Sequence, residues 1–84
     1  MADITLKLFA SLGDFLPAGA EYNAIQVSLP EGATIGSAIE KFKVPQEKCH
    51  LVLLNGAFVP PSQRSSAPLN DGDTVAIWPP VAGG

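Results

Sequence analysis

One segment of the chain repeats its apolar residues at the spacing of an α-helix. The residues that share this helix face are Ile35, Ala38, Ile39 and Phe42. Intervals of three and four residues place apolar side chains on one side of a helix. Thr34 is a preferred N-cap residue, and Pro45 predicts that the helix ends at or before Val44. We therefore expect a single short helix of about ten residues.

Three other segments alternate apolar and polar side chains with the period of a half-buried β-strand. They are residues 4–10, 24–29 and 74–78. The apolar run 50–54 is followed by Asn-Gly at 55–56, which predicts a hairpin returning through 57–59. Glycine and proline within residues 11–23 predict a loop with at most one helical turn, near 12–16.

These elements predict an α+β fold in which one helix packs across a mixed sheet. Because the helix follows the second strand, the first and last strands can pair in the middle of the sheet, which is the β-grasp (ubiquitin-like) arrangement. Residues 1–78 are expected to form this domain, and residues 79–84 a flexible Gly-Gly tail. The expected core residues are Ile4, Leu6, Leu8, Ile25, Val27, Ile35, Ile39, Phe42, Leu53 and Ile77.

Composition excludes several classes of function. Apolar residues make up 46% of the 84 residues and charged residues 15%, which is typical of a globular domain rather than a disordered one. The net charge of −3 argues against nucleic-acid binding. No apolar run approaches the length of a membrane span, and residues 1–4 do not begin a secretory signal. We expect a cytoplasmic protein with no membrane partner.

Few residues could support metal or nucleophilic chemistry. The single cysteine, Cys49, excludes an internal disulfide and a cysteine-based metal site, and we expect it to be a small buried side chain. The single histidine, His50, is expected at the edge of a strand. Asp71 and Asp73 lack the spacing of a calcium loop and are expected to form a turn. We therefore expect no bound metal and no permanently bound cofactor.

The sequence ends in Pro79-Pro80-Val81-Ala82-Gly83-Gly84, directly after the last predicted strand. A C-terminal carboxylate is ionised at neutral pH and is a poor electrophile, so a reaction at Gly84 requires activation, typically by ATP as an acyl-adenylate. Two residues without a Cβ can thread a narrow channel. The two prolines stiffen the start of the tail toward polyproline II.

Aromatic side chains are expected on the outer face of the sheet. Strand alternation places Phe9 and Trp78 opposite the core, and Phe58 joins them if Ala57 and Val59 point inward. An exposed apolar patch of this kind usually binds a partner. The alternative is that these aromatics only cover the edge of the domain.

The chain resembles the MoaD/ThiS family of sulfur carriers, which comprises molybdopterin-synthase small subunits and thiamine sulfur carriers. The resemblance extends over almost the whole chain, at Lys-Leu-Phe-Ala (7–10), Leu-Pro-Glu-Gly-Ala-Thr (29–34), Asn-Gly (55–56), Pro-Leu-Asn-Asp-Gly-Asp-Thr-Val (68–75) and Pro-Pro-Val-Ala-Gly-Gly (79–84). The ending and the length are closer to the molybdopterin branch.

The resemblance implies a carrier rather than an enzyme. An adenylyltransferase similar to ubiquitin-activating enzymes would use ATP to adenylylate Gly84, and a sulfur donor would convert the adenylate to a thiocarboxylate. The tail would then enter the large subunit of molybdopterin synthase and deliver sulfur to the pterin that holds molybdenum or tungsten. The residues implied to contact these partners are Phe9, Phe58, Trp78, Pro79, Pro80, Val81, Ala82 and Gly83.

Some positions depart from the family pattern. The Arg-Glu-rich stretch that usually follows the first strand is replaced by residues 11–16, and Trp78 stands where phenylalanine is common. These departures leave the identity of the sulfur acceptor undecided, because related carriers supply sulfur for the synthesis of thiamine, for the synthesis of cysteine or for tRNA thiolation, and others modify proteins. The alternative to a carrier is a binding module, whose sheet would bind a partner protein and whose tail would take no part in any reaction.

Overall fold

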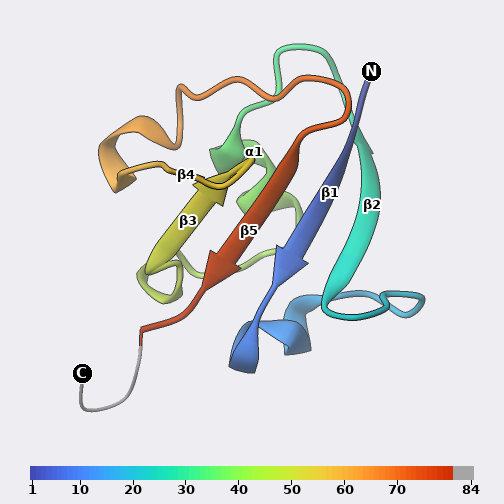
Figure 1. The fold of residues 1–84 in the computed structure, drawn as a ribbon, viewed down its shortest axis with the longest axis vertical. Helices are drawn as coiled ribbons and strands as arrows, with labels where there is room; N and C mark the ends of the chain where they lie inside the picture. The colour runs from blue at the N-terminus through green and yellow to red at the C-terminus, as the bar shows by residue number, and fades with distance from the viewer. Residues whose placement is uncertain (81–84) are drawn as a thin grey trace.

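The structure, a computed structural model, describes residues 1–80 (Figure 1). Its strands are β1 (Ala2–Leu8), β2 (Ala24–Leu29), β3 (Leu51–Leu54), β4 (Ala57–Phe58) and β5 (Thr74–Trp78), and its helix is α1 (Ile35–Lys41). Three 3-10 turns connect them: η1 (Ala10–Phe15), η2 (Gln46–Lys48) and η3 (Pro61–Gln63). The strands form one sheet in the order β2-β1-β5-β3-β4.

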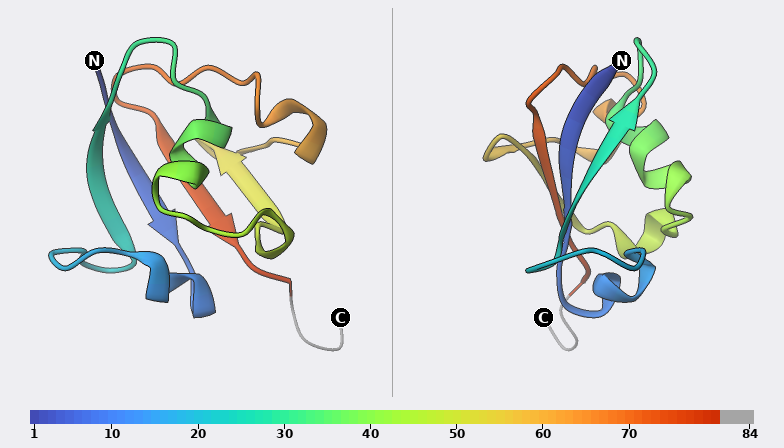
Figure 2. Two further views of the ribbon diagram at one scale, coloured as in Figure 1. Left: turned by 180° about the vertical axis from the view of Figure 1, so that it is seen from behind. Right: turned by 90° about the vertical axis from the view of Figure 1, so that its right-hand side faces the viewer.

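The first and last strands lie side by side in the middle of this sheet, as predicted. β1 and β5 run parallel, with Leu6 opposite Val75 and Leu8 opposite Ile77. The other neighbouring strands pair antiparallel. Helix α1 covers one face of the sheet (Figure 2). The fold is therefore the predicted α+β arrangement, a mixed β-grasp sheet with one helix.

The core lies between α1 and the inner face of the sheet. Six of the expected core residues are buried: Ile4, Leu6, Leu8, Ile35, Ile39 and Ile77. Three more are partly buried and pack against this core: Ile25, Val27 and Phe42. The expectation for Leu53 was wrong, because Leu53 lies opposite Ala76 on the outer face, whereas Val52 lies opposite Ile77 and is fully buried. A continuous apolar run carries no alternation that would distinguish the two faces.

Both ends of α1 are fixed by local hydrogen bonds. Thr34 is the N-cap, as predicted, and it forms a capping box with Ser37. The helix has 7 residues and is shorter than expected. It stops because Lys43 adopts a left-handed conformation, with φ of 58°, and the amide of Val44 donates to the carbonyl of Ile39. This is a Schellman motif with lysine at the position where glycine is usual.

The loop after β1 contributes one core residue that the pattern did not reveal. The turn expected near residues 12–16 is present as η1, and it places Leu12 in the core with no exposed surface. The turn η1 follows directly after β1 and contacts both β1 and β5, and the amide of Leu12 donates to the carbonyl of Phe9. The end of the sheet at which both central strands finish is thus closed by this loop.

Candidate partner-binding face and tail root

The rings of Phe9 and Trp78 stack at the end of the two central strands. Phe9 follows β1 and Trp78 ends β5, and because these strands are parallel, the two residues reach the same end of the sheet (Figure 1). The ring centroids are 4.4 Å apart and the ring planes differ by 6°. Both side chains keep part of their surface exposed. Phe9 and Trp78 therefore lie together on the outer face, as the sequence predicted.

Phe58 lies on the same outer face but farther from the tail. It is opposite Leu53 in the β3–β4 pair, and Leu53 is in turn opposite Ala76 of β5. Directly paired residues share a face of the sheet, so Phe58 projects on the side away from α1. Its exposed fraction is 57%, which is large for a phenylalanine side chain.

Two leucines occupy the space between these aromatics. Leu51 lies opposite Trp78, and Leu53 lies between Ala76 and Phe58. Both leucines are partly exposed. We call the surface made by Phe9, Leu51, Leu53, Phe58 and Trp78 the outer patch. The sequence pattern missed the two leucines, because residues 51–54 are uniformly apolar; only the pairing of β3 with β5 identifies them.

The tail begins where the pairing of β5 ends. The carbonyl of Trp78 accepts a hydrogen bond of 3.0 Å from the amide of His50. Pro79 and Pro80 follow; neither has an amide hydrogen with which to extend the ladder. The predicted site residues Val81, Ala82, Gly83 and Gly84 lie outside the described residues.

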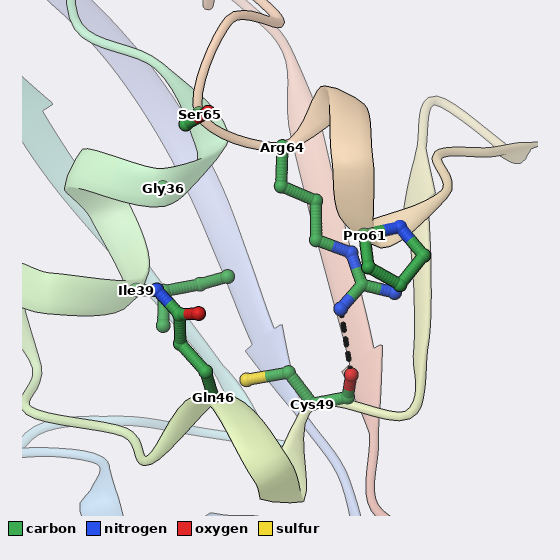
Figure 3. A pocket seen from close by; sticks show the side chains of 7 residues that line it. All are labelled: Gly36, Ile39, Gln46, Cys49, Pro61, Arg64 and Ser65. Carbon is green, nitrogen blue, oxygen red and sulfur yellow. Dashed lines mark hydrogen bonds between the residues drawn. The ribbon is translucent and has the colours of Figure 1, made fainter.

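A cavity of about 290 Å³ lies on the helix side of the sheet, close to Cys49 and Arg64 (Figure 3). Burial raises the pKa of the Cys49 thiol, and the nearby Arg64 guanidinium opposes this rise only in part. The thiol lies 3.6 Å from the carbonyl oxygen of Pro45, to which it donates. Cys49 is 4% exposed, which confirms the expected small buried side chain, whereas His50 is exposed just before β3.

The acidic residues of the last turn bind main-chain amides. Asp71 accepts from the amide of Asp3 at 2.8 Å, and Asp73 accepts from the amide of Asn70 at the same distance. Asp73 also accepts from the side chain of Asn55 at 2.9 Å. These contacts confirm the predicted turn role.

Across residues 1–80, no three side chains of His, Cys, Asp or Glu are grouped so that they could hold a metal ion. Within the same residues, no helix has the length and apolar character needed to cross a membrane.

Comparison with known proteins identifies the family. The structure of a putative molybdopterin converting factor subunit 1 from Pyrococcus furiosus is 27% identical, with a TM-score of 0.68, over 96% of this chain and 100% of that one. Small archaeal modifier protein 1 from Haloferax volcanii is 25% identical, with a TM-score of 0.71, over 96% and 100%.

A third structure supports the fold alone. Subunit 1 in the complex of subunits 1 and 2 of molybdopterin-converting factor from Helicobacter pylori is 18% identical, with a TM-score of 0.60, over 98% of this chain and 99% of that one. No curated protein sequence matches. The sequence model of the ThiS family matches residues 6–84. The chain therefore belongs to the ThiS family, whose members are ubiquitin-like sulfur carriers and modifiers.

Proposed function

We propose that this chain is a sulfur carrier that acts in the cytoplasm in the assembly of molybdopterin, with the carboxyl group of Gly84 as its reactive group. The observation that carries the proposal is the position of the outer patch. The Phe9–Trp78 stack lies immediately before Pro79, which is the first residue after β5. A partner that binds the stack would therefore hold the start of the tail. The Pyrococcus furiosus likeness favours the molybdopterin role over the thiamine role.

The chemistry at Gly84 takes two steps. A partner enzyme joins the carboxylate to the α-phosphate of ATP, which releases pyrophosphate and leaves an acyl-adenylate. A persulfide on a donor protein then attacks the acyl carbon and AMP leaves, which gives an acyl disulfide. A second thiol of the donor attacks the donor-side sulfur of that bond, so that the thiocarboxylate is released and the donor is left with a disulfide. Glycine offers no Cβ that would obstruct approach to the acyl carbon. The carrier supplies the acyl group, and catalysis is assigned to its partners.

Two partners are proposed for the outer patch and the tail. The first is an adenylyltransferase similar to ubiquitin-activating enzymes, and the second is the large subunit of molybdopterin synthase. Large aromatic side chains dominate the binding energy of many protein interfaces. The proposed contacts are Phe9, Phe58, Trp78 and the tail residues from Pro79 to Gly83.

Protein modification is the second candidate function. It is favoured by the likeness to small archaeal modifier protein 1 from Haloferax volcanii. In this case a lysine amine, rather than sulfur, would attack the acyl-adenylate, and an isopeptide bond would form. Both functions share the activated carboxyl group, so the product distinguishes them.

Intact-mass spectrometry of the protein purified from its native cells tests the proposal. For a sulfur carrier we expect a species heavier than the unmodified chain by the difference between one sulfur atom and one oxygen atom. Fragmentation should place this difference at Gly84. Covalent adducts of Gly84 with lysines of other proteins, without the sulfur species, would instead establish the modifier function. An unmodified chain in cells that are making molybdopterin would contradict the proposal.

A further inference from the structure

Arg64 is a buried cation whose hydrogen bonds all go to main-chain carbonyls. Its side chain is 8% exposed, and its acceptors are the carbonyl oxygens of Cys49 at 2.7 Å, Val59 at 3.2 Å and His50 at 3.3 Å. Figure 3 shows the hydrogen bond to Cys49. Burial lowers the pKa of the guanidinium. Burying a charge is costly unless its hydrogen bonds are satisfied, and here the guanidinium nitrogens donate to three carbonyl oxygens.

The main chain of Arg64 is itself held against the helix. Its carbonyl accepts a hydrogen bond of 2.8 Å from the amide of Gly36, in the first turn of α1. A Cβ at Gly36 would lie 3.2 Å from the Cα of Ser65 and 3.4 Å from the Arg64 carbonyl oxygen. The close approach of helix and loop thus depends on glycine. The main chain of Arg64 is therefore held beside α1, and its side chain extends from there to the residues just before β3.

One peptide group links Arg64 to the root of the tail. The Cys49 carbonyl and the His50 amide belong to the same peptide unit: the carbonyl accepts from Arg64, and the amide donates to the carbonyl of Trp78. Hydrogen bonds in such a chain polarise one another, and a charged donor strengthens the effect. The Trp78 carbonyl belongs to the peptide that joins Trp78 to Pro79. Since that peptide is planar and proline restricts φ, holding its carbonyl fixes the direction in which the chain leaves β5.

We propose that Arg64 is a positioning residue that orients the Trp78–Pro79 peptide through the Cys49–His50 peptide, and so directs the tail toward the activating partner. The structural half of this inference is independent of the proposed function, whereas the half that concerns activation rests on it. If Arg64 only held the loop in place, its replacement would lower the stability of the whole domain without a selective effect at His50 and Trp78.

The substitution Arg64→Met tests the inference, because methionine keeps an apolar stem and removes all five N–H donors. We expect the His50 amide to exchange with solvent about tenfold faster or more, as for loss of a hydrogen bond to a charged group. Trp78 is the single tryptophan, so a change in fluorescence spectrum or anisotropy reports on this position alone. We also expect the catalytic efficiency of adenylylation by the activating enzyme to fall about tenfold.

Leu29→Ala is the matched control. Leu29 is 3% exposed and lies opposite Ala2, at the end of the sheet away from Trp78. It should lower the stability of the domain while leaving the His50 amide, the Trp78 signal and adenylylation as in the unmodified protein. Arg64→Lys provides the second variant if Arg64→Met does not fold. Lysine keeps the charge but lacks the planar fork that spans three carbonyls, so it should show the same selective changes.

The outcomes separate cleanly. If a folded Arg64 variant and Leu29→Ala, compared at equal loss of unfolding free energy, give the same His50 exchange and Trp78 signal, Arg64 does not orient the peptide and the inference is overturned. Changed signals with unchanged adenylylation overturn its activation half. If the unmodified protein is not adenylylated by any activating enzyme of its own cell, the proposed function fails, and the exchange and fluorescence results still decide the structural half.

Discussion

The phenyl ring of Phe9 and the indole ring of Trp78 stack with nearly parallel planes and with their centroids 4.4 Å apart, although 68 residues separate them in the sequence. Offset stacking of aromatic rings adds about 0.5–1.5 kcal/mol beyond the burial of their area. The stack joins the ends of the two central strands on the outer face. It also leaves part of each ring exposed beside Pro79. A partner that covers the stack therefore contacts both strands and the start of the tail together.

Substitution of Trp78 by alanine should weaken binding to the activating enzyme or to the large subunit. Aromatic anchors of this kind often contribute about 2 kcal/mol or more on truncation, which corresponds to a dissociation constant raised about thirtyfold. The unfolding free energy should change less than in a core variant, because Trp78 faces away from α1. Titration calorimetry gives the affinity, and urea denaturation gives the stability.

Tyr22→Ala is the control for this experiment. Tyr22 is 95% exposed and belongs to the turn before β2 rather than to the outer patch. Its truncation should leave the affinity unchanged. A Trp78→Ala protein that binds normally but loses most of its stability would show that the indole serves the fold rather than the partner.

Deletion of Gly84 should abolish sulfur loading and leave the domain folded. Its unfolding free energy should match that of the full chain, because β5 ends at Trp78 and Pro79 and Pro80, the last described residues, add no strand to the sheet. Intact-mass measurement after incubation with the activating enzyme, ATP and a sulfur donor reports the loading. Sulfur found on the truncated chain would exclude Gly84 as the required reactive position and would contradict the proposed carrier chemistry.

Leu6 and Leu53 should respond differently to truncation, although both are strand leucines. Leu6 has no exposed surface, whereas Leu53 lies on the outer patch. Leu6→Ala should lower the unfolding free energy by about 2–5 kcal/mol, and Leu53→Ala by less than half as much. Denaturant titrations of the two variants give both values. Equal losses would mean that Leu53 belongs to the core after all.

The contrast between these two leucines shows what the sequence could reveal. Alternation identified the inner residues of β1 and β5, and the order of the elements predicted that these two strands pair in the middle of the sheet. Alternation could not assign the faces of the apolar segment 51–54, because large side chains lie on both faces of this strand. The outer patch leucines and the buried Arg64 depend on pairings between distant segments. No local sequence pattern encodes these pairings. Arg64, for example, lies in a Pro/Ser-rich segment whose composition is typical of a solvent-exposed loop.

The stability of the domain should fall at alkaline pH because of Cys49. Burial raises the pKa of this thiol in the folded state above its ordinary value of about 8.5. The folded protein thus keeps a proton that the unfolded chain loses. This contribution is fully present below the unfolded pKa and declines as the pH rises through the folded pKa, by at most about 1.4 kcal/mol per pH unit.

Cys49→Ala isolates this contribution from the titration of lysine and tyrosine. Urea denaturation of both proteins at several pH values between about 7 and 10 gives the two stability profiles. The profile of the variant should be flatter above the unfolded pKa of the thiol. Parallel profiles would mean that Cys49 ionises equally easily in the folded and unfolded chains.

The parallel pairing of β1 with β5 also determines when the outer patch can form during synthesis. Thr5 finds its partner, Thr74, only after nearly all of the domain has been synthesised. Closing so long a loop is slow, because the entropy of the chain must be lost before the contact forms. Until then the inner edge of β1 has no neighbour, and Phe9 has no ring to stack on. The outer patch is therefore complete only after β5 has been synthesised and has paired with β1.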